Sequence, residues 1–275
     1  MKPIRHMLWL LLAAIALTGC DSNEKDLFVE ELVVQGYLYI GYPLSIDISH
    51  TVPIDQFYDP AAVKVSGADV RIAVDGHEFQ LVEQSPENPG TYALLSDSHI
   101  VTTGKRYDLW LEKGGTIITG TTLAAAMLHI DSTNLENTSF SDPDTIEYGD
   151  TEFYMHWNNN PANFGYFIII ENLEPDWFDE ARTFGEDNGA GMSNVSAMSL
   201  RDTGEFKIPW VFLGSTGTHR VRVFSCEQAL WDYATTTQLG IAENYPISNL
   251  SQGRGVFCAV GVDTAYFELV DWIEN

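Results

Sequence analysis

The sequence predicts an all-β protein, and three observations lead to that fold class. Apolar and polar residues alternate in short runs, which is the period of a strand with one buried face. Glycine, aspartate, asparagine and proline separate these runs. Sustained helical periodicity is nearly absent from the 275 residues. We therefore expect an immunoglobulin-like or transthyretin-like β-sandwich, followed by a second β-rich, sandwich-like domain with one short helix.

Residues 1–19 have the layout of a secretory signal peptide. Lys2 and Arg5 precede an apolar run from Met7 to Leu17, and a basic segment followed by an apolar one is typical of such leaders. This run is too short for a helix that spans a bilayer, which needs about 20 apolar residues. We expect the segment to be removed from the mature chain.

Leu17-Thr18-Gly19-Cys20 looks like a bacterial lipobox, in which a peptidase cuts before the cysteine and the thiol receives a diacylglyceryl group. Acyl chains such as palmitate favour membrane binding by about 0.8 kcal/mol per buried methylene. We expect Cys20 to carry the lipid and residues 20–27 to form a polar tether at the outer membrane, facing the periplasm or the cell surface. The alternative is an ordinary secreted protein with an unmodified Cys20.

Residues 28–124 are expected to form the N-terminal sandwich. Strand patterns cover residues 31–40 and 44–50, and a hairpin covers residues 69–83. Asp75-Gly76 at its centre favours a type I′ turn, whose twist matches that of the flanking strands. A second hairpin, at residues 107–120, turns at Gly114-Gly115. About seven short strands are therefore expected before residue 124.

Residues 125–275 are expected to form the second β-rich domain. Residues 131–150 lose the alternation and are rich in polar turn formers, which indicates a loop or linker. One helix is expected after Ser225, because Ser225 and Gln228 resemble a capping box and Leu230 and Tyr233 share a face. Gly240 is expected near its end. Residues 174–205 contain a long polar loop. The strand patterns occupy residues 151–157, 165–172, 207–213, 219–225, 255–262 and 264–272.

The charge and the cysteines limit the partners. The formal net charge is -25, which argues against nucleic acid as a partner, because phosphate binding needs clustered Lys and Arg. In an oxidising compartment, Cys226 and Cys258 either form one disulfide or stay as two buried free thiols. The sequence leaves both alternatives open.

No catalytic or metal-binding motif is complete. His77-Glu78 lacks the second histidine of a zinc-protease motif, and we assign no catalytic residue, metal ligand or cofactor. Calcium is the one ion considered, because Asp142, Asp144 and Asp150 supply the oxygen ligands that Ca²⁺ prefers. Solvated acidic loops are the favoured interpretation of these residues.

Aromatic residues in turn-rich stretches are the candidate binding residues. Phe57 and Tyr58 lie between aspartates, as do Trp177 and Phe178, and Tyr42 precedes a proline. Exposed aromatic side chains offer a large contact area at low entropic cost. The alternative is that these rings close the open ends of the sandwiches.

The chain resembles the Bacteroidota lipoproteins that carry a domain of unknown function, DUF4249, and that are commonly encoded beside TonB-dependent outer-membrane receptors. The matching stretches are LTGC, LVVQGYL, VSGADVRIAVDGHEFQLVE with PGTYAL, HRVRVFSCEQALWDYATTTQ and YPISNLSQGRGVFCAV. The resemblance implies a two-part β protein that works with such a receptor in nutrient uptake. Only Cys20 transfers as a site residue, as the acylated position.

These observations lead to one functional hypothesis and two alternatives. We expect a non-enzymatic, membrane-anchored binding or accessory module. The first alternative is a structural or adhesive envelope lipoprotein without a small ligand. The second is a hydrolase whose catalytic residues are dispersed along the chain.

Overall fold

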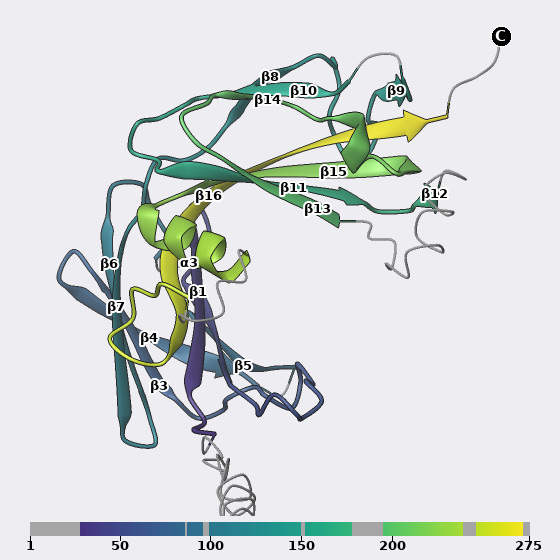
Figure 1. Cartoon of the computed structure of the whole chain (residues 1–275). Helices are drawn as coiled ribbons and strands as arrows, with labels where there is room; N and C mark the ends of the chain where they lie inside the picture. The colour runs from purple at the N-terminus through teal and green to yellow at the C-terminus, as the bar shows by residue number, and fades with distance from the viewer. Residues whose placement is uncertain are drawn as a thin grey trace, which may run out of the picture.

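The computed structural model describes residues 28–85, 87–95, 99–149, 152–177, 195–238 and 246–271. Strands dominate this part of the chain. It also holds the α-helix α3 (Gln228–Gln238) and the single 3-10 turn η1 (Trp210–Phe212). Figure 1 shows this arrangement, which confirms the all-β prediction. Cys20 and the expected tether, residues 20–27, lie outside the described residues.

The strands before residue 124 follow one another closely. They are β1 (Leu32–Tyr39), β2 (Ser45–His50), β3 (Asp69–Val74), β4 (His77–Gln84), β5 (Asn88–Ala93), β6 (Arg106–Lys113) and β7 (Thr116–Leu123). The later strands are β8 (Ile130–Thr133), β9 (Thr145–Glu147), β10 (Tyr154–Trp157), β11 (Gly165–Asn172), β12 (Asp176–Trp177), β13 (Val195–Leu200), β14 (Glu205–Lys207), β15 (Ser215–Cys226) and β16 (Arg254–Val270).

Hydrogen bonds join most of these strands into one sheet. Its order is β13-β11-β15-β16-β1-β2-β5-β4-β3-β6-β7, with β12 beside β15 and β9 beside β16. The strands β14, β10 and β8 form a second, small sheet. We call β1–β7 with the first half of β16 the first unit, and β8–β15 with the second half of β16 the second unit.

Both hairpin predictions are confirmed. Asp75 and Gly76 have φ angles of 51° and 78°, and Gly114 and Gly115 have 60° and 85°. Positive φ at both central residues defines the type I′ turn. The register agrees, because β3 pairs with β4 up to Val74 opposite His77.

Several expectations for the second unit need correction. Residues 131–150 hold β8 and β9 rather than loop alone. The strand expected over residues 207–213 is interrupted because Pro209, with no N–H to donate, leads into η1. Ser225 does not cap α3: it lies in β15, and its hydroxyl donates to the carbonyl of Ala126 (3.2 Å). Gly240 lies outside the described residues.

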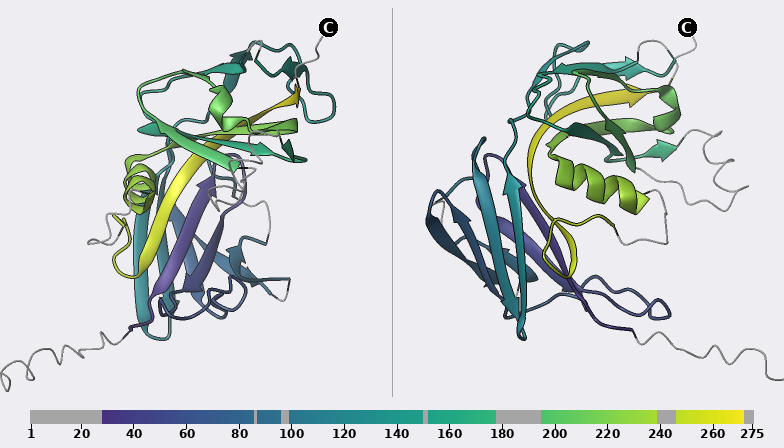
Figure 2. Two further views of the ribbon diagram at one scale, coloured as in Figure 1. Left: turned by 45° about the vertical axis from the view of Figure 1, so that its right-hand side comes forward. Right: turned by 60° about the vertical axis from the view of Figure 1, so that its left-hand side comes forward.

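The two strands expected over residues 255–262 and 264–272 are one strand, β16. Its first half pairs in parallel with β1, from Arg254 opposite Val33 to Val260 opposite Tyr39. Its second half pairs antiparallel with β15, starting at Gly261 opposite Ser225. Figure 2 shows β16 as one long curved strand that runs from the first unit into the second. One strand therefore joins the two units.

Side chains of β16 alternate between the cores and the concave side of the sheet. Phe257 and Ala259 belong to the first core, and Ala265, Phe267 and Leu269 belong to the second. All five have odd numbers, as the period of two requires. The expected domain boundary near residue 124 stays a prediction, and the first core includes residues far beyond it.

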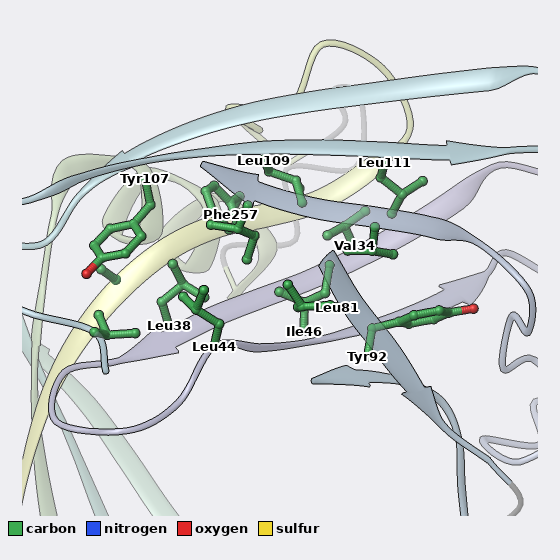
Figure 3. Packing of buried hydrophobic residues seen from close by; sticks show 14 of the residues in the cluster. Val34, Leu38, Leu44, Ile46, Leu81, Tyr92, Tyr107, Leu109, Leu111 and Phe257 are labelled. Atoms are coloured by element: carbon green, nitrogen blue, oxygen red, sulfur yellow. The ribbon is translucent and has the colours of Figure 1, made fainter. Parts of the chain in front are cut away.

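The first core lies inside a curled sheet. β7 returns toward β16, where Gly120 forms a bridge with Leu250 and the amide of Ser251 donates to the carbonyl of Thr119 (2.8 Å). Figure 3 shows the side chains that fill the interior. Among these buried residues are Val34, Leu38, Leu44, Ile46, Leu81, Tyr92, Tyr107, Leu109, Leu111 and Phe257.

Residues 124–129 connect β7 of the first unit to β8 of the second, and they cross β16 at Gly261. A Cβ at this glycine would lie 2.9 Å from the amide nitrogen of Leu128 and 3.2 Å from the carbonyl oxygen of Ala126. Ala126 and Leu128 are buried, so the connection packs tightly against the strand. A glycine here lets the backbone of the connection reach the backbone of β16.

The pairing of β1 with β16 depends on Gly255. Its φ is +102°, and a Cβ would lie 1.9 Å from the carbonyl oxygen of Val34. Gly41 is the matched control, because its φ is +90° and nothing lies within 4 Å of the Cβ position.

We predict that Gly41→Ala lowers the free energy of unfolding by about 1–2 kcal/mol, the cost of positive φ in a residue with a Cβ. Gly255→Ala should cost at least about 2 kcal/mol more, because the two strands must separate. Urea denaturation followed by tryptophan fluorescence measures both changes. Equal losses in the two variants would contradict the proposed close contact.

Candidate functional site

A groove lies on the concave side of the sheet where the two units meet. It has a volume of about 710 Å³ and is lined from β1, β2, β15 and β16, from the end of β5 and from the turn after β1. We call it the central groove. The residues that give it its chemistry are Tyr37, Tyr39, Tyr42, Asp47, Arg222 and Phe224.

The strand period places these side chains in the groove. In β1, Val34 and Leu38 face the first core, so Tyr37 and Tyr39 point to the opposite side. In β15, Val221 faces the second core, and its neighbour Arg222 lines the groove. The two strands that carry Tyr39 and Arg222 are both paired with β16.

Two tyrosines form the aromatic part of the central groove. Tyr39 is 40% exposed and Tyr42 is 59% exposed. Their ring centroids lie 6.4 Å apart with an interplanar angle of 78°. The turn between them is fixed, because the amide of Gly41 donates to the carbonyl of Val101 (2.9 Å). These rings therefore present a defined apolar surface in the groove.

Arg222 supplies the positive charge of the groove. Its Nη2 lies 3.6 Å from Oε2 of Glu171, and its guanidinium carbon lies 5.6 Å from the ring centroid of Phe224. Its Nε is buried and has no hydrogen-bond partner among the described residues. Burial raises the pKa of Tyr39, and the charge of Arg222 opposes that rise.

Asp47 supplies a negative charge that is already compensated. Its Oδ1 accepts a hydrogen bond from Thr91 Oγ1 (2.5 Å) and lies 3.4 Å from the ammonium of Lys64. A partly exposed ion pair of this kind contributes little to stability. Arg222 differs from Asp47, because its partner Glu171 lies 3.6 Å from Nη2. That distance is longer than an ordinary hydrogen bond.

Helix α3 covers the concave face beside β1 and β16, as the right-hand view of Figure 2 shows. Trp231 stacks on Phe167 of β11, with ring centroids 5.5 Å apart. Leu230 packs with Cys226 and Cys258 in a separate apolar cluster. The helix thus fills part of the concave face, and the lining residues of the central groove come from strands and turns.

Cys226 and Cys258 are buried free thiols in the structure, which is one of the two alternatives that the sequence left open. Burial raises the pKa of Cys226 to about 12 and that of Cys258 well above its ordinary value. Both thiols are therefore protonated near neutral pH, and a thiol is a much weaker nucleophile than a thiolate.

A half-buried carboxylate joins the two units beside α3. Glu227 accepts hydrogen bonds from the hydroxyl of Thr122 and from the amide of Leu123 (3.3 Å). The same Thr122 oxygen accepts a hydrogen bond from the amide of Ala259 in β16 (3.0 Å). Burial raises the pKa of Glu227, although these hydrogen bonds oppose the rise.

The other candidate binding residues lie away from the central groove or cannot be placed. Phe57 and Tyr58 are 89% and 57% exposed and are not among the residues that line the groove. Trp177 lies in β12, opposite Ser215 of β15. Phe178 lies outside the described residues.

Asp144, one of the three aspartates suggested as calcium ligands, has a structural role. Oδ2 of Asp144 accepts hydrogen bonds from the amides of Glu136 and Asn137, each at 2.9 Å. Asp150 lies outside the described residues. Within the described ranges no group of three or more His, Cys, Asp or Glu residues could hold a metal ion.

Sequence reasoning found Tyr42 but missed Tyr39, Asp47 and Arg222. The sequence does carry a signal for these residues. In a strand such as HRVRVFS, one face is apolar and the opposite face holds charged or aromatic residues. Such residues usually face solvent. Only the pairing of β1 and β15 with the same strand shows that they line one groove.

Comparison with known families agrees with the resemblance noted in the sequence. The model of the family described as "Domain of unknown function (DUF4249)" matches residues 20–264. The chain belongs to the DUF4249 family. No curated protein matches this DUF4249 chain. Among its described residues, no helix has the length and apolar character needed to cross a membrane.

Glu227 makes stability depend on pH in a defined direction. Because its pKa is higher in the folded chain than the value of about 4.3 in an unfolded one, the folded state binds more protons between the two values. Stability from this group is therefore present at low pH and is lost as the pH rises through the folded pKa.

We predict that the wild type gains stability relative to Glu227→Gln when the pH falls from 7 to 5, because the variant has no proton to bind at this position. All other groups are common to both chains and cancel in the comparison. Urea denaturation of both chains at the two pH values measures the difference. If the difference in stability between the two chains is the same at both pH values, the pKa of Glu227 is not raised in the folded chain.

Proposed function

We propose that this DUF4249 protein is a lipid-anchored, non-enzymatic binding or accessory module of the outer membrane. It contacts its ligand or partner through the central groove. The observation that carries the proposal is the groove itself, which exposed tyrosines of one unit line together with a guanidinium of the other. Pockets of about 300–1,000 Å³ with a few placed polar groups are typical of ligand sites.

The chemistry of the described titratable groups supports binding rather than catalysis. His219 is buried and stacks on Phe267, with ring centroids 4.9 Å apart. Burial lowers its pKa to about 4, far from the value near the working pH that suits a general base. Cys226 and Cys258 are protonated and packed among apolar side chains.

Membrane attachment through Cys20 would give the binding site its partner. Residues 17–20 resemble a lipobox, and the family resemblance implies a TonB-dependent receptor in the same membrane. Confinement by a short tether raises the effective concentration of two components to the millimolar range. A modest contact at the groove is then sufficient for cooperation in nutrient uptake.

We predict that the native protein, purified from mild detergent extracts, brings with it a large β-barrel receptor identified by mass spectrometry. The double variant Tyr39→Ala/Tyr42→Ala should recover at least about tenfold less receptor, because the aromatic contact area is lost. Phe57→Ala/Tyr58→Ala tests the other exposed aromatic pair. Val211→Ala is the matched control, because Val211 is 83% exposed and lies in η1, away from the groove.

The outcomes separate the candidate functions. If wild type recovers no receptor, the accessory role is wrong and the structural or adhesive alternative is favoured. If only the Phe57/Tyr58 variant fails, the binding surface is that loop and not the groove. The same preparation tests the anchor, because its intact mass should correspond to a chain that begins at an acylated Cys20.

A further inference from the structure

We infer that the central groove binds a carboxylate that is attached to an aromatic or apolar group, with Arg222 as the residue that holds the carboxylate. This inference rests on the proposed binding role of the groove and names the class of its ligand. It is drawn from the hydrogen bonds and charges around Arg222 and from the rings that face it.

Arg222 has hydrogen-bond donors that Glu171 does not occupy. A guanidinium carries five N–H donors in a planar fork. The Glu171 carboxylate oxygen lies 3.6 Å from Nη2, which is beyond ordinary hydrogen-bond distance. The buried Nε has no partner among the described residues. Because the Arg222 side chain is 34% exposed, its Nη donors, rather than the buried Nε, are the ones that an acceptor in the groove reaches.

Glu171 lies beside two positive charges. Its Oε2 is hydrogen-bonded to Nη2 of Arg220 and is also the atom nearest to Arg222. One carboxylate thus serves two guanidiniums, which leaves a local excess of positive charge. This excess is notable in a chain with a formal net charge of -25. Asp47, the acid that lines the groove, is paired with Lys64 and does not neutralise it.

Aromatic side chains line the groove together with Arg222. Phe224 lies next to the guanidinium, and Tyr39 and Tyr42 present exposed rings from the first unit. Aromatic rings favour contact with a flat apolar group. A guanidinium fork matches the two oxygens of a carboxylate. The combination selects an apolar carboxylate, such as the end of a peptide with an aromatic last residue.

A monoanion fits this site better than a dianion. Arg222 offers one positive charge, and the rest of the protein is strongly acidic. A phosphate monoester would bring a second negative charge at neutral pH. The groove volume of about 710 Å³ suits a small molecule or a few residues of a peptide.

The test compares N-acetyl-L-phenylalanine, its uncharged amide and inorganic phosphate as probes of the mature chain. Isothermal titration calorimetry measures the dissociation constants. We expect the carboxylate to bind at least about tenfold more tightly than the amide, since hydrogen bonds between charged groups are the stronger ones. Arg222→Gln should abolish that preference, and Arg222→Lys should keep part of it, because the charge remains but the fork is lost.

Arg106→Gln is the matched control, because it also removes one positive charge but lies on β6, where the side chain is 67% exposed. It should keep the preference for the carboxylate. Circular dichroism confirms that each variant is folded.

Equal affinity for acid and amide, equal affinity of wild type and Arg222→Gln for the acid, or no binding of the acid would overturn the inference. Tighter binding of phosphate than of the acid would also overturn it. None of these results affects recovery of the receptor, so failure of the ligand class and failure of the proposed function are distinguishable.

Discussion

The pairing of one strand with both units is the constraint on which the rest of the structure depends. The residues of β16 alternate strictly, so that Phe257 enters the first core and Phe267 enters the second. A shift of the register by one residue would turn both rings to the concave side at once. The two cores therefore fix a single register together, and neither can change it alone.

This shared strand also determines the geometry of the central groove. Tyr39 lies on β1 and Arg222 on β15, and these strands pair with successive halves of β16. The close crossing at Gly261 and the hydrogen bonds of Glu227 hold the same junction from two sides. The walls of the groove thus belong to one continuous sheet, and a ligand meets a site whose parts are already in place.

Local patterns predicted the parts of the fold that depend on neighbours in sequence. The turn at Asp75-Gly76 followed from residues that tolerate positive φ, and the short helix followed from its apolar face. Long-range pairing was not predictable in this way. The strand pattern breaks at Asp263 in the sequence, yet β16 continues through it, and the connection crosses the strand at Gly261. The groove was missed for the same reason, because Tyr39 and Arg222 are far apart in sequence.

Scanning calorimetry of Phe267→Ala tests the role of the shared strand most directly. The substitution removes a ring from the second core that stacks on Phe153, and it should cost about 3–5 kcal/mol. If β16 couples the two cores, wild type and variant each unfold in one transition, and the whole transition moves to lower temperature. A variant that shows two transitions, with one left at the wild-type temperature, would contradict the account.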